Sequence, residues 1–224
     1  MRLDVFTLVP DAFAWMRERR PLAGVLGSGL DFRVFNYRET TPLTAGQVDD
    51  EPYGGGRGMV LRVDVVAAAL DAVYGGVPEQ RVLALSPQGR QLDQELVEEL
   101  AREPALTLLS ARFEGFDQRI LDQFATDVVS IGPYVLSGGE IPAMAVVDAV
   151  VRRLPGALSD GSGELESFSA ALDGGLEYPQ YTRPAEFRGW SVPEILLSGD
   201  HGRIETWRRE HVRSRSDEQT MTRA

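Results

Sequence analysis

Four short glycine-bearing segments are the parts of this chain best suited to hold a ligand. They follow apolar runs that predict strands, and they cover residues 85–89, 110–115, 130–136 and 137–140. Glycine lets the backbone approach a ligand closely, so that N–H and C=O groups can recognise it. In open α/β sheets, ligands bind beyond the carboxyl ends of the strands, where such loops converge. The four segments together predict a loop-built ligand pocket, although each one alone is also typical of an ordinary turn.

Several common kinds of catalytic site are excluded by the residues that the sequence lacks. There is no G-x-G-x-x-G, no P-loop and no G-x-S-x-G elbow. All 23 basic residues are arginine, so Schiff-base and pyridoxal chemistry on a lysine is excluded. The chain has no cysteine, which removes disulfides, thiolate nucleophiles and iron–sulfur clusters. With only His201 and His211 present, a histidine-rich metal site is not expected either.

The elements that would position the four segments alternate between strands and helices. Strands are predicted at 2–9, 32–35, 81–85, 105–109 and 127–130, and helices at 11–20, 62–73, 94–102, 116–124 and 140–153. Residues 36–58 form a long stretch that is predicted to be irregular. Alternation at this spacing predicts βαβ units around a mostly parallel sheet.

The sequence pattern changes at Pro155. Residues 156–175 are rich in glycine, serine and acidic side chains, which is typical of a flexible linker. A small segment follows, with scattered apolar residues and an arginine-bearing helix predicted at 200–211, and the last dozen residues are expected to fray.

Length and charge limit the class of protein further. A chain of 224 residues with 43% apolar residues can form one domain, or one domain with a small appendage. No apolar run approaches the roughly 20 residues of a membrane span, so a soluble cytoplasmic protein with no membrane partner is expected. The formal charge of −11 argues against a protein that coats nucleic acid, but a local arginine face remains compatible with it.

Six motifs in a fixed order carry a resemblance to a known family. They are VDDEPYGGGRGM at 48–59, LSPQG at 85–89, RFEG at 112–115, IGPYVLSGGE at 131–140, YTRP at 181–184 and LLSGDH at 196–201. In this order, and over nearly the whole chain, they resemble the bacterial tRNA (guanine-N1)-methyltransferases, which modify the guanine immediately 3′ of the anticodon. These enzymes belong to the SPOUT class.

The resemblance implies a fold, a domain organisation and an assembly. The implied fold is an α/β sheet with helices on both faces and a deep trefoil knot, a departure from the general rarity of knots. Residues 1–155 would form the knotted domain that binds S-adenosylmethionine, 156–176 a flexible linker, and 177–224 a small helical domain that binds tRNA. The family works as a homodimer with active sites at the subunit interface.

The resemblance also implies the cofactor site. S-adenosylmethionine would lie bent in the knot, with backbone groups of Ile131, Tyr134 and Leu136 holding its adenine. The implied cofactor-binding residues are Leu85, Ser86, Pro87, Gln88, Gly89, Ala111, Phe113, Glu114, Gly115, Ile131, Gly132, Pro133, Tyr134, Val135, Leu136, Gly138 and Gly139. No metal ligand is assigned, and a requirement for Mg²⁺ is left open.

Methylation of guanine N1 requires two further groups. N1 carries a proton at neutral pH, so a base must remove it, and a cation near O6 stabilises the charge that develops. Arg152 matches the family's O6-stabilising arginine, and its alternative role is that of a solvated cation at a helix end. Glu166 stands where the family has its general base, an aspartate, and Glu177 is a possible substitute.

The tRNA surface implied by the resemblance is built largely from arginine. Its planar guanidinium suits contacts to phosphates and to guanine edges. The substrate-binding residues expected are Asp50, Tyr53, Arg57, Glu177, Arg183 and Arg208. For the helix that carries Arg208, a solvated face paired with its own glutamates is an equally good interpretation.

This sequence departs from the family pattern at four positions of the expected site. Ala111 replaces glycine, Phe113 replaces tyrosine, Pro133 replaces aspartate and Glu166 replaces aspartate. The first three predict weaker binding of S-adenosylmethionine. Two alternatives follow: a SPOUT RNA methyltransferase with another target, or a catalytically weak dimer that binds tRNA or a nucleoside.

Overall fold

The computed structural model describes residues 1–213 except 160–161 and 163–164, and the expected frayed end at 214–224 lies outside the described residues. The chain divides into two compact units, Met1–Leu158 and Ser159–Ala224. Most of the expected linker, 156–176, thus belongs to the second unit.

The first unit is built on a sheet of five parallel strands in the order β2-β1-β6-β5-β7. The strands are β1 (Arg2–Thr7), β2 (Asp31–Asn36), β5 (Arg81–Gln91), β6 (Ala105–Leu109) and β7 (Asp127–Ser130). The predicted parallel α/β sheet is therefore confirmed. The neighbouring strands β6, β5 and β7 end at the same edge, which brings the loops that follow them together.

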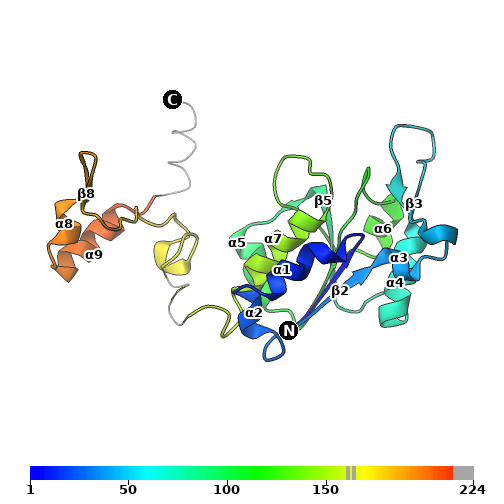
Figure 1. Ribbon diagram of the computed structural model, residues 1–224, viewed down its shortest axis with the longest axis horizontal. Coiled ribbons are helices and arrows are strands. Elements are labelled where there is room, and N and C mark those ends of the chain that lie inside the picture. Colours follow the sequence, from blue (N-terminus) through cyan, green and yellow to red (C-terminus); the bar gives the residue numbers. More distant parts are fainter. Residues whose placement is uncertain (160–161, 163–164, 214–224) are drawn as a thin grey trace. The chain divides into compact units, whose positions relative to one another are not determined.

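Helices cover both faces of this sheet (Figure 1). One face carries α1 (Ala14–Arg17), α2 (Leu22–Val25), α5 (Gln94–Ala101) and α7 (Glu140–Val151), and the other carries α3 (Tyr37–Thr40), α4 (Val63–Tyr74) and α6 (Gln118–Gln123). Side chains alternate along each strand, so Val5 joins the core on the first face and Phe6 the core on the second. Val5 and Phe6 are both fully buried, and the two cores hold in place the edge of the sheet from which the loops extend.

Two elements predicted near the start of the chain end earlier in the structure. The helix expected at 11–20 is wrong in length: a 3-10 turn at Pro10–Phe13 leads into α1, which ends at Arg17. Pro21 disfavours helical backbone at the residue before it, so the helix does not continue to residue 20. The first strand ends at Thr7 rather than at residue 9, because the Thr7 hydroxyl accepts a 3.0 Å hydrogen bond from the Val9 amide.

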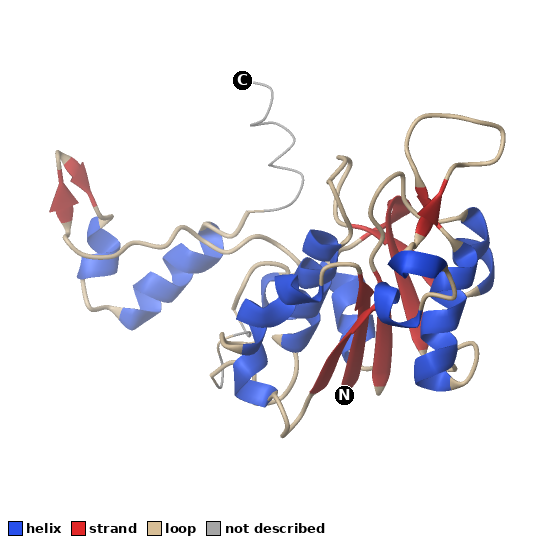
Figure 2. Ribbon diagram, turned by 45° about the vertical axis from the view of Figure 1, so that its right-hand side comes forward, coloured by secondary structure: helices blue, strands red, loops and turns tan. Residues whose placement is uncertain are grey.

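The stretch 36–58 is also more ordered than its composition indicated. It contains α3, a 3-10 turn at Thr44–Gly46, and β3 (Asp49–Asp50), which pairs antiparallel with β4 (Val60–Leu61). The loop between β3 and β4 holds the glycine-rich motif and projects from the first unit (Figure 2).

The second unit contains short elements. It holds a 3-10 turn (Ala170–Leu172), the hairpin β8 (Glu186–Phe187) and β9 (Trp190–Ser191), and the helices α8 (Glu194–Leu197) and α9 (His201–Glu210). The predicted helix at 200–211 is confirmed in α9, where the Asp200 carboxylate caps the amide of Arg203 at 3.1 Å. The backbone of 165–176 forms hydrogen-bonded turns, among them a 2.7 Å bond from the Phe168 amide to the Gly175 carbonyl.

Candidate functional site

A cavity of about 350 Å³ lies in the first unit, at the carboxyl ends of β5, β6 and β7. Its walls come from the three loops that follow these strands. All of the expected cofactor-binding residues line it except Gly89 and Pro133. The structure therefore brings together segments that are far apart in the sequence.

The first wall exists because β5 is interrupted by a bulge. Val129 of β7 pairs with both Leu85 and Arg90 of β5, so residues 86–89 loop out of the sheet between the two pairings. A Cβ atom on Gly89 would lie 2.4 Å from the carbonyl carbon of Val128. Gly89 thus contributes to the cavity indirectly, by letting the bulge close against β7.

The other two walls are joined to each other through their backbones. The Gly139 amide donates a 2.7 Å hydrogen bond to the Ala111 carbonyl, and the Ser110 hydroxyl donates a 3.2 Å bond to the Gly139 carbonyl. A Cβ atom on Gly139 would lie 2.8 Å from the Cα atom of Ser110. Only glycine permits this approach without displacing the backbone.

The character of the cavity changes from its walls to its mouth. Its walls are largely apolar, and the charged side chains that line it are Arg112 and Glu114. Phe113 lies between these two with φ of +62°, an uncommon conformation for a residue with a side chain. Near the mouth, Tyr134 is 52% exposed and Val135 is 85% exposed. Exposed apolar side chains gathered beside a cavity are typical of an interaction surface.

The glycine-rich loop between β3 and β4 rests on the second wall. The Glu114 amide donates a 2.9 Å hydrogen bond to the Met59 carbonyl, and a Cβ atom on Gly58 would overlap the Glu114 side chain. At the tip of the loop Tyr53 is fully exposed, and Arg57 is exposed as well. Two of the expected substrate-binding residues are thus accessible on a loop that contacts the second wall at Met59.

Asp50, at the base of the same loop, is already engaged in an ion pair. Its carboxylate accepts a 2.8 Å hydrogen bond from Arg62, which also contacts Asp64 at 2.7 Å. The hydrogen bonds from Arg62 lower the pKa of Asp64, so the charge cluster is maintained at neutral pH. In this structure Asp50 therefore fixes the loop to the start of α4.

Glu140 is the residue of this region that the sequence interpretation missed. It is only 4% exposed, and it contacts Thr7 and Arg112 beside the cavity. A glutamate in the first turn of a helix is ordinarily a solvated side chain that favours the helix dipole, so its position predicts no more than a helix start. The sequence signal that could have identified Glu140 as buried is the apolar composition of the helix that it begins.

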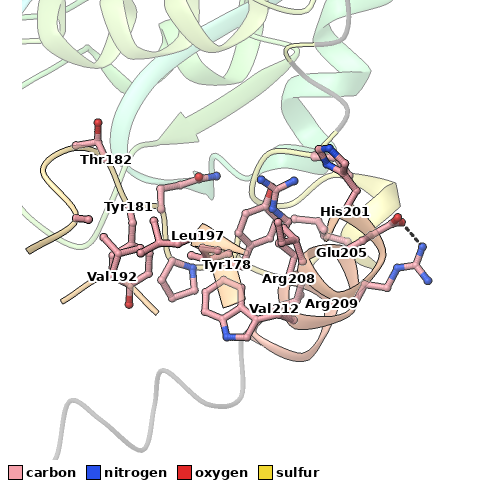
Figure 3. A pocket seen from close by; sticks show the side chains of 18 of the residues that line it. Tyr178, Tyr181, Thr182, Val192, Leu197, His201, Glu205, Arg208, Arg209 and Val212 are labelled. Carbon is pink, nitrogen blue, oxygen red and sulfur yellow. Dashed lines mark hydrogen bonds and ion pairs between the residues drawn. The ribbon is translucent and has the colours of Figure 1, made fainter. Parts of the chain in front are cut away.

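A second cavity, of about 950 Å³, lies within the second unit (Figure 3). Arg183 and Arg208, two of the expected substrate-binding residues, line it together with Tyr178, Tyr181 and Trp207. The guanidinium of Arg208 lies 5.1 Å from the centre of the Tyr178 ring. This cavity combines aromatic faces with cations, which suits bases and phosphates.

The remaining candidates are distributed over both units. Arg152 caps the carboxyl end of α7 and is half-buried, while Glu166 is half-buried in the second unit. The Glu177 amide donates a 3.0 Å bond to the Ser167 hydroxyl, and the Glu177 carboxylate accepts a bond from Gln180. The structure thus places the expected base and the expected cation in different units.

Two further features are absent from the described residues. No group of three or more acidic or histidine side chains in the described part of the chain is arranged to hold a metal ion. None of the helices in the described ranges is long and apolar enough to cross a membrane.

The fold and the first cavity define an α/β protein with a cavity formed by loops at the ends of three adjacent parallel strands. The family described as "tRNA (Guanine-1)-methyltransferase TrmD" matches residues 1–222. The chain belongs to this family.

Curated relatives agree with the family match. A tRNA (guanine-N(1)-)-methyltransferase of Brevibacillus brevis is 47% identical over 93% of this chain and 85% of its own length. Proteins of the same name from Geobacter metallireducens and Rhodopseudomonas palustris are 46% and 49% identical, over 97% and 92% of this chain and 90% and 83% of their own lengths.

Proposed function

We propose that this protein transfers a methyl group from S-adenosylmethionine to N1 of the guanine immediately 3′ of the anticodon in tRNA. The observation that carries the proposal is the single cavity lined by the loops at 85–88, 111–116 and 129–139, in a chain that belongs to the tRNA (guanine-1)-methyltransferase family. The proposed compartment is the cytoplasm.

The first cavity fits the proposed methyl donor. Its volume of about 350 Å³ lies within the range of about 300–1,000 Å³ that is usual for ligand pockets. Apolar side chains such as Leu85 and Leu136 suit the flat adenine, and Arg112 and Glu114 suit the charged amino-acid end. When bound, S-adenosylmethionine supplies an electrophilic methyl group on a positively charged sulfur. The contribution of the loops is to bind and orient it.

Two side chains are proposed to make guanine N1 nucleophilic. Glu166 takes the proton from N1, since a carboxylate is a suitable general base, and Arg152 stabilises the negative charge that develops on O6. A glutamate has one methylene more than the aspartate of the family, and catalytic geometry tolerates a displacement of only ~0.5 Å. The hydrogen-bonded turns at 165–176 support the proposal, because the backbone conformation there can place the carboxylate of the longer glutamate side chain where the base is needed.

The proposal includes an assembly and a domain arrangement. Two copies form a dimer with active sites at the subunit interface, and the exposed apolar residues Phe113, Tyr134 and Val135 beside the cavity support it. Residues 1–155 carry the trefoil knot, which membership of the family supports. Residues 156–176 act as a linker to a tRNA-binding domain at 177–224, supported by the aromatic and arginine-lined second cavity.

Transfer of labelled methyl groups tests the proposed function directly. The purified protein is incubated with labelled S-adenosylmethionine and a tRNA transcript that carries guanine 3′ of the anticodon. The control transcript carries adenine there. Transfer to the guanine transcript alone, with the label recovered as 1-methylguanine, is expected. Transfer to both transcripts, or to neither by a folded protein that binds the donor, would replace the proposal by one of its two alternatives, another RNA target or a binding role.

A further inference from the structure

Glu140 is a buried acidic side chain beside the first cavity that the proposed reaction does not use. It is 4% exposed, and it is the first residue of α7. A buried carboxylate is costly unless it is paired and hydrogen-bonded, so its partners show what it stabilises.

One oxygen of Glu140 joins two segments that lie far apart in the sequence. Oε1 accepts a 2.9 Å hydrogen bond from the hydroxyl of Thr7, at the end of β1, and a 3.2 Å bond from Nε of Arg112, in the second wall. Glu140 itself directly follows Gly139, at the end of the third wall. One carboxylate therefore connects the sheet, the second wall and the third wall.

Arg112 supplies the positive charge that balances this carboxylate. Tyr37 also lies near this carboxylate, and its hydroxyl is buried without a hydrogen-bond partner in the described part of the chain. Burial, and secondarily the nearby charge of Glu140, raise the pKa of Tyr37 well above its ordinary value. Tyr37 therefore stays neutral, so the negative charge that faces the Arg112 guanidinium here is that of Glu140.

We infer that Glu140 is a positioning residue for binding of the methyl donor, acting through Arg112 and the contact of the second wall with the third. This inference rests on the proposed function, because it takes the first cavity to be the donor site. Arg112 lines that cavity with its side chain 37% exposed, whereas Glu140 does not line it. Loss of the charge on Glu140 would free the guanidinium and loosen both walls.

Glu140→Gln tests the inference, with Asp4→Asn as the matched control. Glutamine keeps an acceptor for Thr7 but loses the charge that holds Arg112. Asp4, in β1, is the other buried carboxylate among the described residues, it pairs with Arg33 at 2.7 Å, and it does not line the cavity. The readouts are the Kd for S-adenosylmethionine by titration calorimetry, kcat at saturating donor, and the midpoint of thermal unfolding without ligand.

The expected result is a Kd raised about tenfold or more by Glu140→Gln, from the loss of a charge-assisted hydrogen bond, with kcat largely retained. Asp4→Asn should lower the unfolding midpoint and leave the Kd within about twofold. Glu140→Gln and Arg112→Gln combined should weaken binding no more than Arg112→Gln alone, because both act through the same guanidinium.

Several results would overturn the inference. An unchanged Kd in Glu140→Gln would do so, as would an equal rise in Kd in Asp4→Asn, which would reflect general destabilisation. If Glu140→Gln does not fold, Thr7→Val removes the other contact of the same carboxylate, and an unchanged Kd there would count against the inference. If the wild-type protein binds no donor although it is folded, the donor-site assignment itself fails, and the inference with it.

Discussion

The Gly139 amide donates a 2.7 Å hydrogen bond to the Ala111 carbonyl, although 28 residues separate them in the chain. This bond makes one continuous surface from the loops that follow β6 and β7. The Ser110 hydroxyl, which donates to the Gly139 carbonyl, closes the same contact from the other side. The walls of the first cavity therefore depend on each other. A substitution in one loop should weaken ligand binding by the cavity as a whole.

Gly139→Ala should weaken binding of S-adenosylmethionine by about tenfold to 100-fold, which corresponds to a typical overpacking cost. The new Cβ would lie 2.8 Å from the Cα of Ser110 and 2.9 Å from the amide nitrogen of Ala111. Titration calorimetry measures the Kd. Gly29→Ala is the control, since the nearest atom to its new Cβ would be 3.9 Å away. Equal affinity in the two variants would mean that the contact between the walls is not required.

Glu166→Gln should abolish methyl transfer and leave the Kd for S-adenosylmethionine unchanged. The amide that replaces the carboxylate cannot accept the proton of guanine N1, whereas the proposed site for the donor is formed by the loops of the other unit. Single-turnover assays with tRNA measure the chemical step. Glu177→Gln is the comparison, and turnover that survives in Glu166→Gln but not in Glu177→Gln would transfer the role of base to Glu177.

Arg152→Gln should lower kcat by about 10²–10³-fold, in line with the removal of one group that stabilises developing negative charge. Arg153→Gln is the matched control on the next residue, where the guanidinium lies 3.6 Å from the Glu98 carboxylate and should serve structure alone. Steady-state rates at saturating donor and tRNA distinguish the two. Equal losses in both variants would assign Arg152 to the end of α7 and not to catalysis.

Asp127→Asn should lower the free energy of unfolding at pH 7 by about 1 kcal/mol, a value discounted for the partial exposure of this pair. Hydrogen bonds of 2.7 and 2.8 Å from Arg81 lower the pKa of Asp127 in the folded protein. The stability that Asp127 contributes to the folded protein is therefore fully present above the pKa of about 3.9 that it has in the unfolded chain. This stability is lost as the pH falls through the lower pKa that Asp127 has in the folded protein.

Urea unfolding of wild type and Asp127→Asn at several pH values checks this dependence. The difference between the two proteins should be constant from pH 7 to pH 5 and should shrink below about pH 4. The exposed Asp122, mutated to Asn, is the control and should change stability by less than about 0.5 kcal/mol at pH 7. A difference that grows on acidification would contradict the assignment.

The sequence predicted the parallel sheet because its strands are apolar and recur with helices between them. It predicted the ends of elements less well, since these depend on single contacts. The helix expected at 11–20 is shortened before Pro21, and the strand expected at 81–85 continues through a bulge to Gln91 because the chain pairs twice with Val129. No local sequence pattern predicts this bulge, because the residue that it pairs with lies on another strand.

For the candidate site, the sequence by itself predicted which segments form the loops, because glycine at the end of an apolar run is typical of a loop. The tertiary structure alone decided that three of these loops form one cavity, since that depends on β6, β5 and β7 being neighbours. It also decided that Glu140 is buried and that Gly89 serves the bulge and does not line the cavity. Burial and close approach are properties of residues far apart in the chain, and only packing brings them together.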